Sequence, residues 1–194
     1  MRKGVWLWCL LFSAGASAHE VALGGGFGAG FSHPVLGLDH LLAMLSVGMV
    51  STRLGRHAIW QVPLAFLCFM SLGAVLGIAD IALPLVEAGI ALSVMLLGLA
   101  IAFNRALPLW PAMLAVAIFG IFHGHAHGME MPTLASPWLY GLGFLLGTAT
   151  IHLIGVFTGL LLAMKERRYP LTRITGAGIA AMGTLFLIGT VLPG

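Results

Sequence analysis

The stretch from His33 to Gly48, HPVLGLDHLLAMLSVG, places His33, Asp39 and His40 at the start of a long apolar segment. A charged side chain near the centre of a membrane helix costs about 2.5–3.5 kcal/mol on insertion scales, so ionisable residues are rare there and usually functional. Imidazole and carboxylate groups together are also ligands that borderline divalent metal ions accept. The stretch therefore predicts a membrane helix that carries metal-binding chemistry.

The composition excludes an ordinary soluble domain. Of the 194 residues, 60% are hydrophobic and only 8% are charged, whereas soluble domains carry about 25% charged residues. The mean hydropathy of +1.06 agrees. We therefore expect an all-α membrane protein with the lipid bilayer as its surroundings. The pI near 9.3 does not indicate nucleic-acid binding, because the few basic residues lie in short loops and form no patch.

The first 18 residues have the pattern of a secretory signal peptide. Arg2 and Lys3 supply the charged start, residues 5–12 the apolar centre, and Ala16-Ser17-Ala18 a cleavage site of small residues. Cleavage would leave residues 19–194 as a single six-helix transmembrane domain. An uncleaved first helix is the alternative. The glycine-rich residues 19–32 are expected to form a loop.

Six apolar segments follow, each long enough to cross a hydrocarbon core of about 30 Å. Polar breaks separate them, and several begin near a proline, which is tolerated in the first turn of a helix. We expect these helices to form one bundle. The spans lie near residues 34–52, 58–79, 84–103, 110–128, 137–164 and 174–192.

The loop charges predict the orientation of the bundle. Every lysine and arginine after the signal peptide falls in the first, third or fifth loop between spans, and cytoplasmic loops are the ones enriched in these residues. Both termini of the mature chain are therefore expected outside, in a bacterial inner membrane. The residues concerned are Arg53, Arg56, Arg105, Lys165, Arg167, Arg168 and Arg173.

The fourth segment ends in FHGHAHGME, which is dense in metal-binding side chains. His123, His127 and Glu130 have helical spacing (i, i+4, i+7) that puts them on one face, whereas His125 points away. Two imidazoles one turn apart are a familiar pair of metal ligands. A single histidine here would be read as a polar cap, but three histidines with a glutamate favour a metal site.

Two further segments carry one ionisable group each. Glu87 lies near the start of the third span, and His152 lies far inside the fifth, with Thr148 one turn earlier. Each alone fits a structural role as well as a functional one. With the expected topology, however, all groups but His152 share the outer half of the bundle. The candidate metal-binding residues are His33, Asp39, His40, Glu87, His123, His127, Glu130 and His152.

The ligand types narrow the choice of metal. Oxygen-only sites suit magnesium or calcium, and thiolates suit zinc clusters or copper(I). Histidine with carboxylate and no usable cysteine suits nickel, cobalt or zinc, and the residues do not rank these three. We expect the ion to be transported and not tightly bound as a cofactor, because a dispersed set of ligands allows reversible coordination.

These motifs resemble those of a known family. HPVLGLDHLLAMLSVG, FHGHAHGME and VEAGIALSV strongly resemble segments of the HupE/UreJ family, membrane proteins associated with hydrogenase and urease maturation. The resemblance implies a secondary permease, and no enzyme, that imports nickel(II), sometimes cobalt, across the inner membrane. It also implies metal-handling roles for the matching positions, which are His33, Asp39, His40, Glu87, His123, His127 and Glu130.

Two other functions use the same residues. His123, His127 and Asp39 with a third histidine could hold zinc and an activated water, as in an intramembrane hydrolase. A metal sensor or delivery protein would bind the ion without moving it. The amount of metal retained and the flux across sealed vesicles separate these alternatives from a permease.

Overall fold

The structure is a computed structural model that describes residues 26–103, 108–131, 136–165 and 170–192. These residues form α-helices joined by short connections, and no strand occurs among them. The predicted signal peptide and the loop residues before Gly26 lie outside the described residues. The helices are α3 (Phe27–Leu36), α4 (Leu38–Ser51), α5 (Ala58–Ile78), α6 (Val86–Phe103), α7 (Leu109–Met129), α8 (Pro137–Lys165) and α9 (Leu171–Val191).

The helix lengths confirm the prediction of an all-α membrane protein. Five helices, α5 to α9, are long and apolar enough to cross a membrane. The number reaches six if α3 and α4 are counted together as one interrupted span. The orientation drawn from the loop charges stays a prediction.

The chain separates into two compact units, and each is described by itself. The described residues of the smaller unit fall within 1–34 and 133–147, and those of the larger unit fall within 35–132 and 148–194. In the smaller unit, α3 packs closely on the first turns of α8. A Cβ on Gly30 would overlap the backbone of Tyr140, and one on Gly143 would overlap that of Phe27. The expectation of a loop over residues 19–32 is therefore wrong from Phe27 onward, because these glycines serve helix contact.

The first predicted span is interrupted at Gly37. This residue is extended (φ −95°, ψ 118°) between α3 and α4. The 14 residues of α4 cover only about 21 Å, so one continuous helix near 34–52 is not what forms. A Cβ on Gly37 would lie 3.0 Å from Asp39 Oδ1 and 3.1 Å from His40 Nδ1. Glycine at the break thus leaves room for the Asp39 and His40 side chains.

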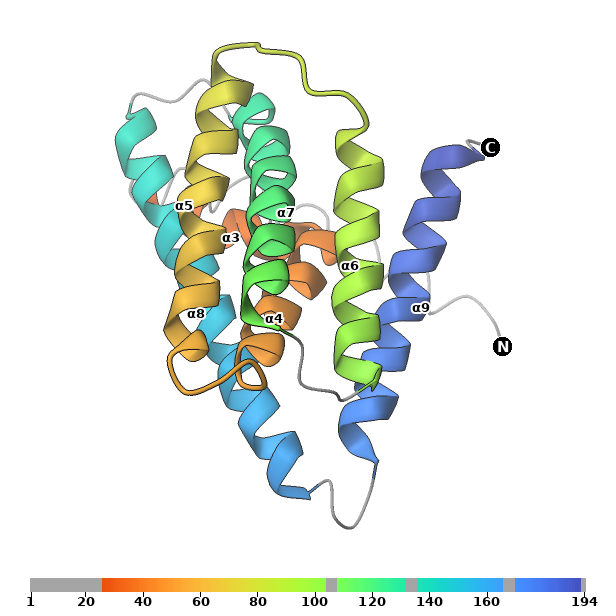
Figure 1. The fold of residues 1–194 in the computed structure, drawn as a ribbon. Coiled ribbons are helices and arrows are strands. Elements are labelled where there is room, and N and C mark those ends of the chain that lie inside the picture. Colours follow the sequence, from red (N-terminus) through yellow and green to blue (C-terminus); the bar gives the residue numbers. More distant parts are fainter. Residues whose placement is uncertain (1–25, 104–107, 132–135, 166–169, 193–194) are drawn as a thin grey trace, which may run out of the picture. The chain divides into compact units, whose positions relative to one another are not determined.

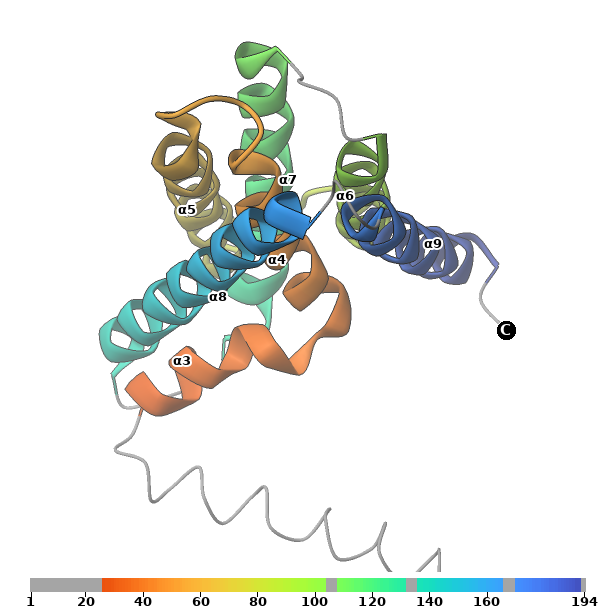
Figure 2. The ribbon, with the colours of Figure 1, turned by 90° about the horizontal axis from the view of Figure 1, so that it is seen from below.

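Close helix pairs build the larger unit. Figures 1 and 2 show α5 beside α7 and α6 beside α9. In the first pair, a Cβ on Gly124 would overlap the carbonyl of Met70. In the second, a Cβ on Gly98 would overlap the backbone of Ala180. Lipid gives no hydrophobic drive for helix association, so backbones this close gain stability from van der Waals contact.

A third glycine contact joins α4 to α8. A Cβ on Gly48 would overlap the carbonyl oxygen of His152, and one on Gly155 would overlap that of Leu45. The helix that carries Asp39 and His40 in its first turn is therefore packed backbone to backbone against the turn that carries His152. Small residues on both helices fix the level of these side chains relative to one another.

Polarity in the larger unit is arranged for a lipid environment. Large apolar side chains such as Trp60, Leu153 and Phe157 are exposed, whereas His123, Thr148 and His152 are buried. Ionisable groups in membrane helices almost always face the bundle interior or a polar cavity. The buried histidines therefore mark the candidate functional site.

Candidate functional site

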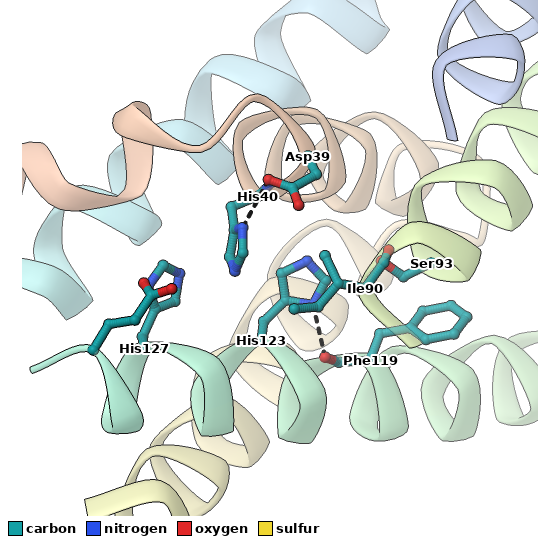
Figure 3. A network of polar contacts seen from close by, with 8 residues as sticks. Asp39, His40, Ile90, Ser93, Phe119, His123 and His127 are labelled. Atoms are coloured by element: carbon teal, nitrogen blue, oxygen red, sulfur yellow. Dashed lines mark hydrogen bonds and ion pairs between the residues drawn. The ribbon is translucent and has the colours of Figure 1, made fainter. Parts of the chain in front are cut away.

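Three imidazole rings from two helices meet in the larger unit. The ring centroid of His40 on α4 lies 4.9 Å from that of His123 and 4.2 Å from that of His127, both on α7. The spacing of four residues puts the two α7 rings on one face, and Figure 3 shows them rising from α7 toward His40. All three side chains are buried. We call these three residues the histidine cluster.

Asp39 sets the state of the His40 ring. Its Oδ1 atom accepts hydrogen bonds from His40 Nδ1, at 2.9 Å, and from the His40 backbone N–H, at 2.8 Å. A carboxylate oxygen only accepts, so the ring carries its proton on Nδ1. The lone pair is then on Nε2, which is buried and has no hydrogen-bond partner among the described residues. A carboxylate that orients a histidine in this way is typical of metal sites.

The helix backbone likewise determines which ring nitrogen of His123 carries the proton. Its Nδ1 lies 2.9 Å from the carbonyl oxygen of Phe119, one turn earlier on α7. A carbonyl oxygen cannot donate, so Nδ1 carries the proton and Nε2 the lone pair. That Nε2 is also buried and finds no donor within the described part of the chain. Buried polar atoms almost always have a partner, so two such nitrogens in one cluster indicate a ligand.

Phe66 and His152 continue the row of rings beyond the cluster. The Phe66 centroid lies 5.4 Å from that of His123 and 5.2 Å from that of His152. Phe66 and His152 are fully buried. No pattern in the sequence indicated Phe66, because one phenylalanine in an apolar helix is indistinguishable from an ordinary core residue.

The two glutamates lie at helix ends and are exposed. Glu130 follows the last turn of α7, with its Oε2 4.0 Å from Nδ1 of His127. Glu87 lies in the first turn of α6, and among the described residues it forms no hydrogen bond or ion pair with the cluster. Glu130 is thus placed at the rim of the cluster, and Glu87 is not brought against it.

His33 and His125 each have an aromatic or hydrogen-bond contact of their own. His33 belongs to the smaller unit, where its ring centroid lies 5.8 Å from that of Tyr140 and 6.3 Å from that of Phe144. His125 points away from the cluster, as its spacing indicated, and its Nε2 bonds the carbonyl oxygen of Ile81 at 2.8 Å. That bond fastens the connection after α5 to α7, which is a structural role.

The fold and the cluster together define a class: a multi-pass membrane protein with imidazole ligands buried among apolar helices. Residues 7–186 match the family described as HupE / UreJ protein. Protein HupE of Rhizobium leguminosarum bv. viciae is 42% identical over 174 residues, which cover 90% of this chain and 91% of that protein. The chain therefore belongs to the HupE/UreJ family. No solved structure matches it significantly.

Proposed function

We propose that the chain is a secondary transporter that imports a divalent transition-metal ion, nickel(II) foremost and cobalt(II) second, across the bacterial inner membrane. The observation that carries the proposal is the histidine cluster, whose His40 and His123 rings are held with Nε2 lone pairs buried and without a donor. Membership of the HupE/UreJ family supports it. The family also suggests that the ion supplies hydrogenase or urease maturation.

The ligand chemistry fits a moderately bound nickel ion. Neutral imidazole suits nickel, cobalt and zinc, and nickel binds more tightly than cobalt to a given nitrogen site. Three neutral rings leave the charge of the ion to be balanced by Asp39, through His40, and by Glu130 at the rim. A transported ion must also be released from its site. The Asp39 carboxylate is bonded to Nδ1 of His40 and is held away from the Nε2 lone pairs, which keeps the affinity for the ion moderate.

The order of residues suggests a route. Glu130 stands exposed at the end of α7, His127 and His40 come next, and His123 follows one turn deeper. Phe66 and then His152 lie beyond it. With the predicted orientation, the ion would enter from outside at Glu130, lose its water in the cluster and move inward past Phe66.

Nickel flux into sealed vesicles tests the proposal. Purified protein in proteoliposomes should accumulate nickel, and His40→Ala or His123→Ala should abolish the uptake because each removes a buried ligand. His57→Ala is the matched control, since His57 is exposed before the first turn of α5. Binding without flux in the intact protein would contradict transport and favour a sensor or delivery protein. Tightly retained zinc with hydrolytic activity would favour the hydrolase.

A further inference from the structure

Two polar side chains on α8 are buried and unused by the cluster. His152 is 1% exposed and Thr148 is 0% exposed. Within the described residues, neither ring nitrogen of His152 nor the Oγ1 of Thr148 has a hydrogen-bond partner. The two residues are four apart on one helix and therefore share a face. An imidazole and a hydroxyl thus line the same buried spot.

The Thr148 hydroxyl lacks the local hydrogen bond that other threonines of the described helices make. Thr158 bonds the carbonyl oxygen of Ile154 at 2.8 Å and Thr184 that of Ala180 at 2.9 Å, whereas Thr148 Oγ1, like Ser46 Oγ on α4, has no partner among the described residues. Such a bond is always within reach of a threonine in a helix and satisfies its proton locally. A buried threonine that forgoes this bond, beside a histidine with two unbonded nitrogens, points to a polar ligand.

The spot is distinct from the histidine cluster. The Phe66 ring contacts both the His123 ring and the His152 ring, and it is nearly perpendicular to the latter at 88°. On the other side, the His152 carbonyl is packed against Gly48 of α4, so this turn of α8 is fixed in place. Imidazole nitrogen is a primary ligand for borderline divalent metals. A hydroxyl beside it can accept or donate a hydrogen bond to water carried by the ion.

We propose that His152 and Thr148 form a second, deeper binding station for the transported divalent cation, adjacent to the histidine cluster through the shared contact with Phe66. The inference rests on the proposed transport function and adds a second place for the ion to pause. Two moderate sites in series let an ion leave the first without crossing the whole apolar interior unsolvated.

The number of nickel ions bound by the purified full-length protein tests this directly. Titration with nickel chloride should give two ions per wild-type chain, and one each for His152→Ala and His40→Ala. Flux in proteoliposomes should fall about tenfold or more in His152→Ala, the size of effect that loss of a supporting metal-site group has. Binding that is equal in His152→Ala and wild type would overturn the second station.

The binding count separates this proposal from transport itself. Two ions in the wild type and one in His152→Ala, without flux in either, would leave the second station standing and refute the transport function. If the wild type transports nickel but binds a single ion, and His152→Ala changes neither property, the transport function stands and the second station is refuted.

Two conservative substitutions separate an effect on nickel binding from a loss of the fold. Thr148→Val keeps the shape and removes the hydroxyl, and Thr158→Val does the same at an exposed, locally bonded position on the same helix. We expect only Thr148→Val to lower the affinity for the second nickel ion, by about tenfold as for other groups that support metal ligands. The melting temperature should stay unchanged in both variants. Equal nickel binding by the two variants would overturn the role of Thr148.

Discussion

A single carboxylate shows how this site works at the level of the residue. The sequence suggested Asp39 as one of the metal-handling groups, next to His40. In the structure its Oδ1 is occupied by the Nδ1–H and the backbone N–H of His40. We therefore expect Asp39 to act through the imidazole, by fixing the ring and by making its other nitrogen a stronger donor to a metal.

Asp39→Asn should weaken nickel binding without abolishing it. The amide oxygen can still accept the Nδ1 proton, but the negative charge is gone, so the affinity should fall about 10–100-fold. His40→Ala should remove binding to the cluster altogether. Isothermal titration with nickel measures both, with Asp80→Asn in an exposed connection as the control. Equal loss in Asp39→Asn and His40→Ala would mean that Asp39 is itself a ligand.

At the level of the helix, glycines decide which side chains meet. Gly120, Gly124 and Gly128 lie on the face of α7 that packs against the backbone of α5. This contact leaves His123 and His127 on a neighbouring face, toward α4. The same helix therefore carries a packing face and a ligand face, and disturbing the first should disturb the second.

Gly124→Ala should lower both the stability and the nickel affinity of the protein. The new methyl group would overlap the carbonyl of Met70, which is backbone and has little freedom to move. Overpacking of this kind costs about 1–3 kcal/mol. The melting temperature in detergent measures the stability loss.

Gly178→Ala is the matched control for that experiment. Gly178 on α9 has no atom within 4 Å of a built Cβ, and alanine is a better helix former by about 1 kcal/mol. The melting temperature should therefore stay the same or rise. A Gly124→Ala protein as stable as the Gly178→Ala protein would contradict the packing described for α5 and α7.

How much the sequence predicts also depends on the element. The apolar runs predict α5 to α9 well, because length and hydropathy are properties of each segment alone. The four-residue spacing predicts that His123 and His127 share a face, for the same reason. The helical start of α3 and the break at Gly37 were not predictable, because the glycines there act through neighbours distant in the chain or through the Asp39–His40 contact. Phe66 was not predictable either, since only its contacts with the rings of His123 and His152 distinguish it from other core residues.

At the level of the whole molecule, contacts between protein groups position the histidine cluster. These contacts are the Asp39–His40 and His123–Phe119 hydrogen bonds and the glycine contacts between helices. This arrangement differs from structural zinc sites, where the binding energy of the metal is also the folding energy. The cargo should therefore stabilise the fold without being required for it.

Chelation should accordingly leave the protein folded, and nickel should stabilise it. At a free nickel concentration of 100 times the dissociation constant, the gain is about 2.7 kcal/mol. Thermal unfolding with EDTA and with nickel chloride measures both states. The nickel-induced rise should be smaller in His123→Ala, which keeps only the second station, and should be unchanged in His57→Ala. Unfolding by EDTA alone would contradict a preformed site.

The most direct test of the account is X-ray absorption at the nickel edge of the loaded protein. It should show an imidazole-rich nitrogen shell around nickel. The imidazole scattering should decrease in His127→Ala and in His40→Ala and stay unchanged in His125→Ala, whose ring bonds a backbone carbonyl. A shell of oxygen ligands without imidazole, in the wild type, would contradict the claim that the histidine cluster holds the transported ion.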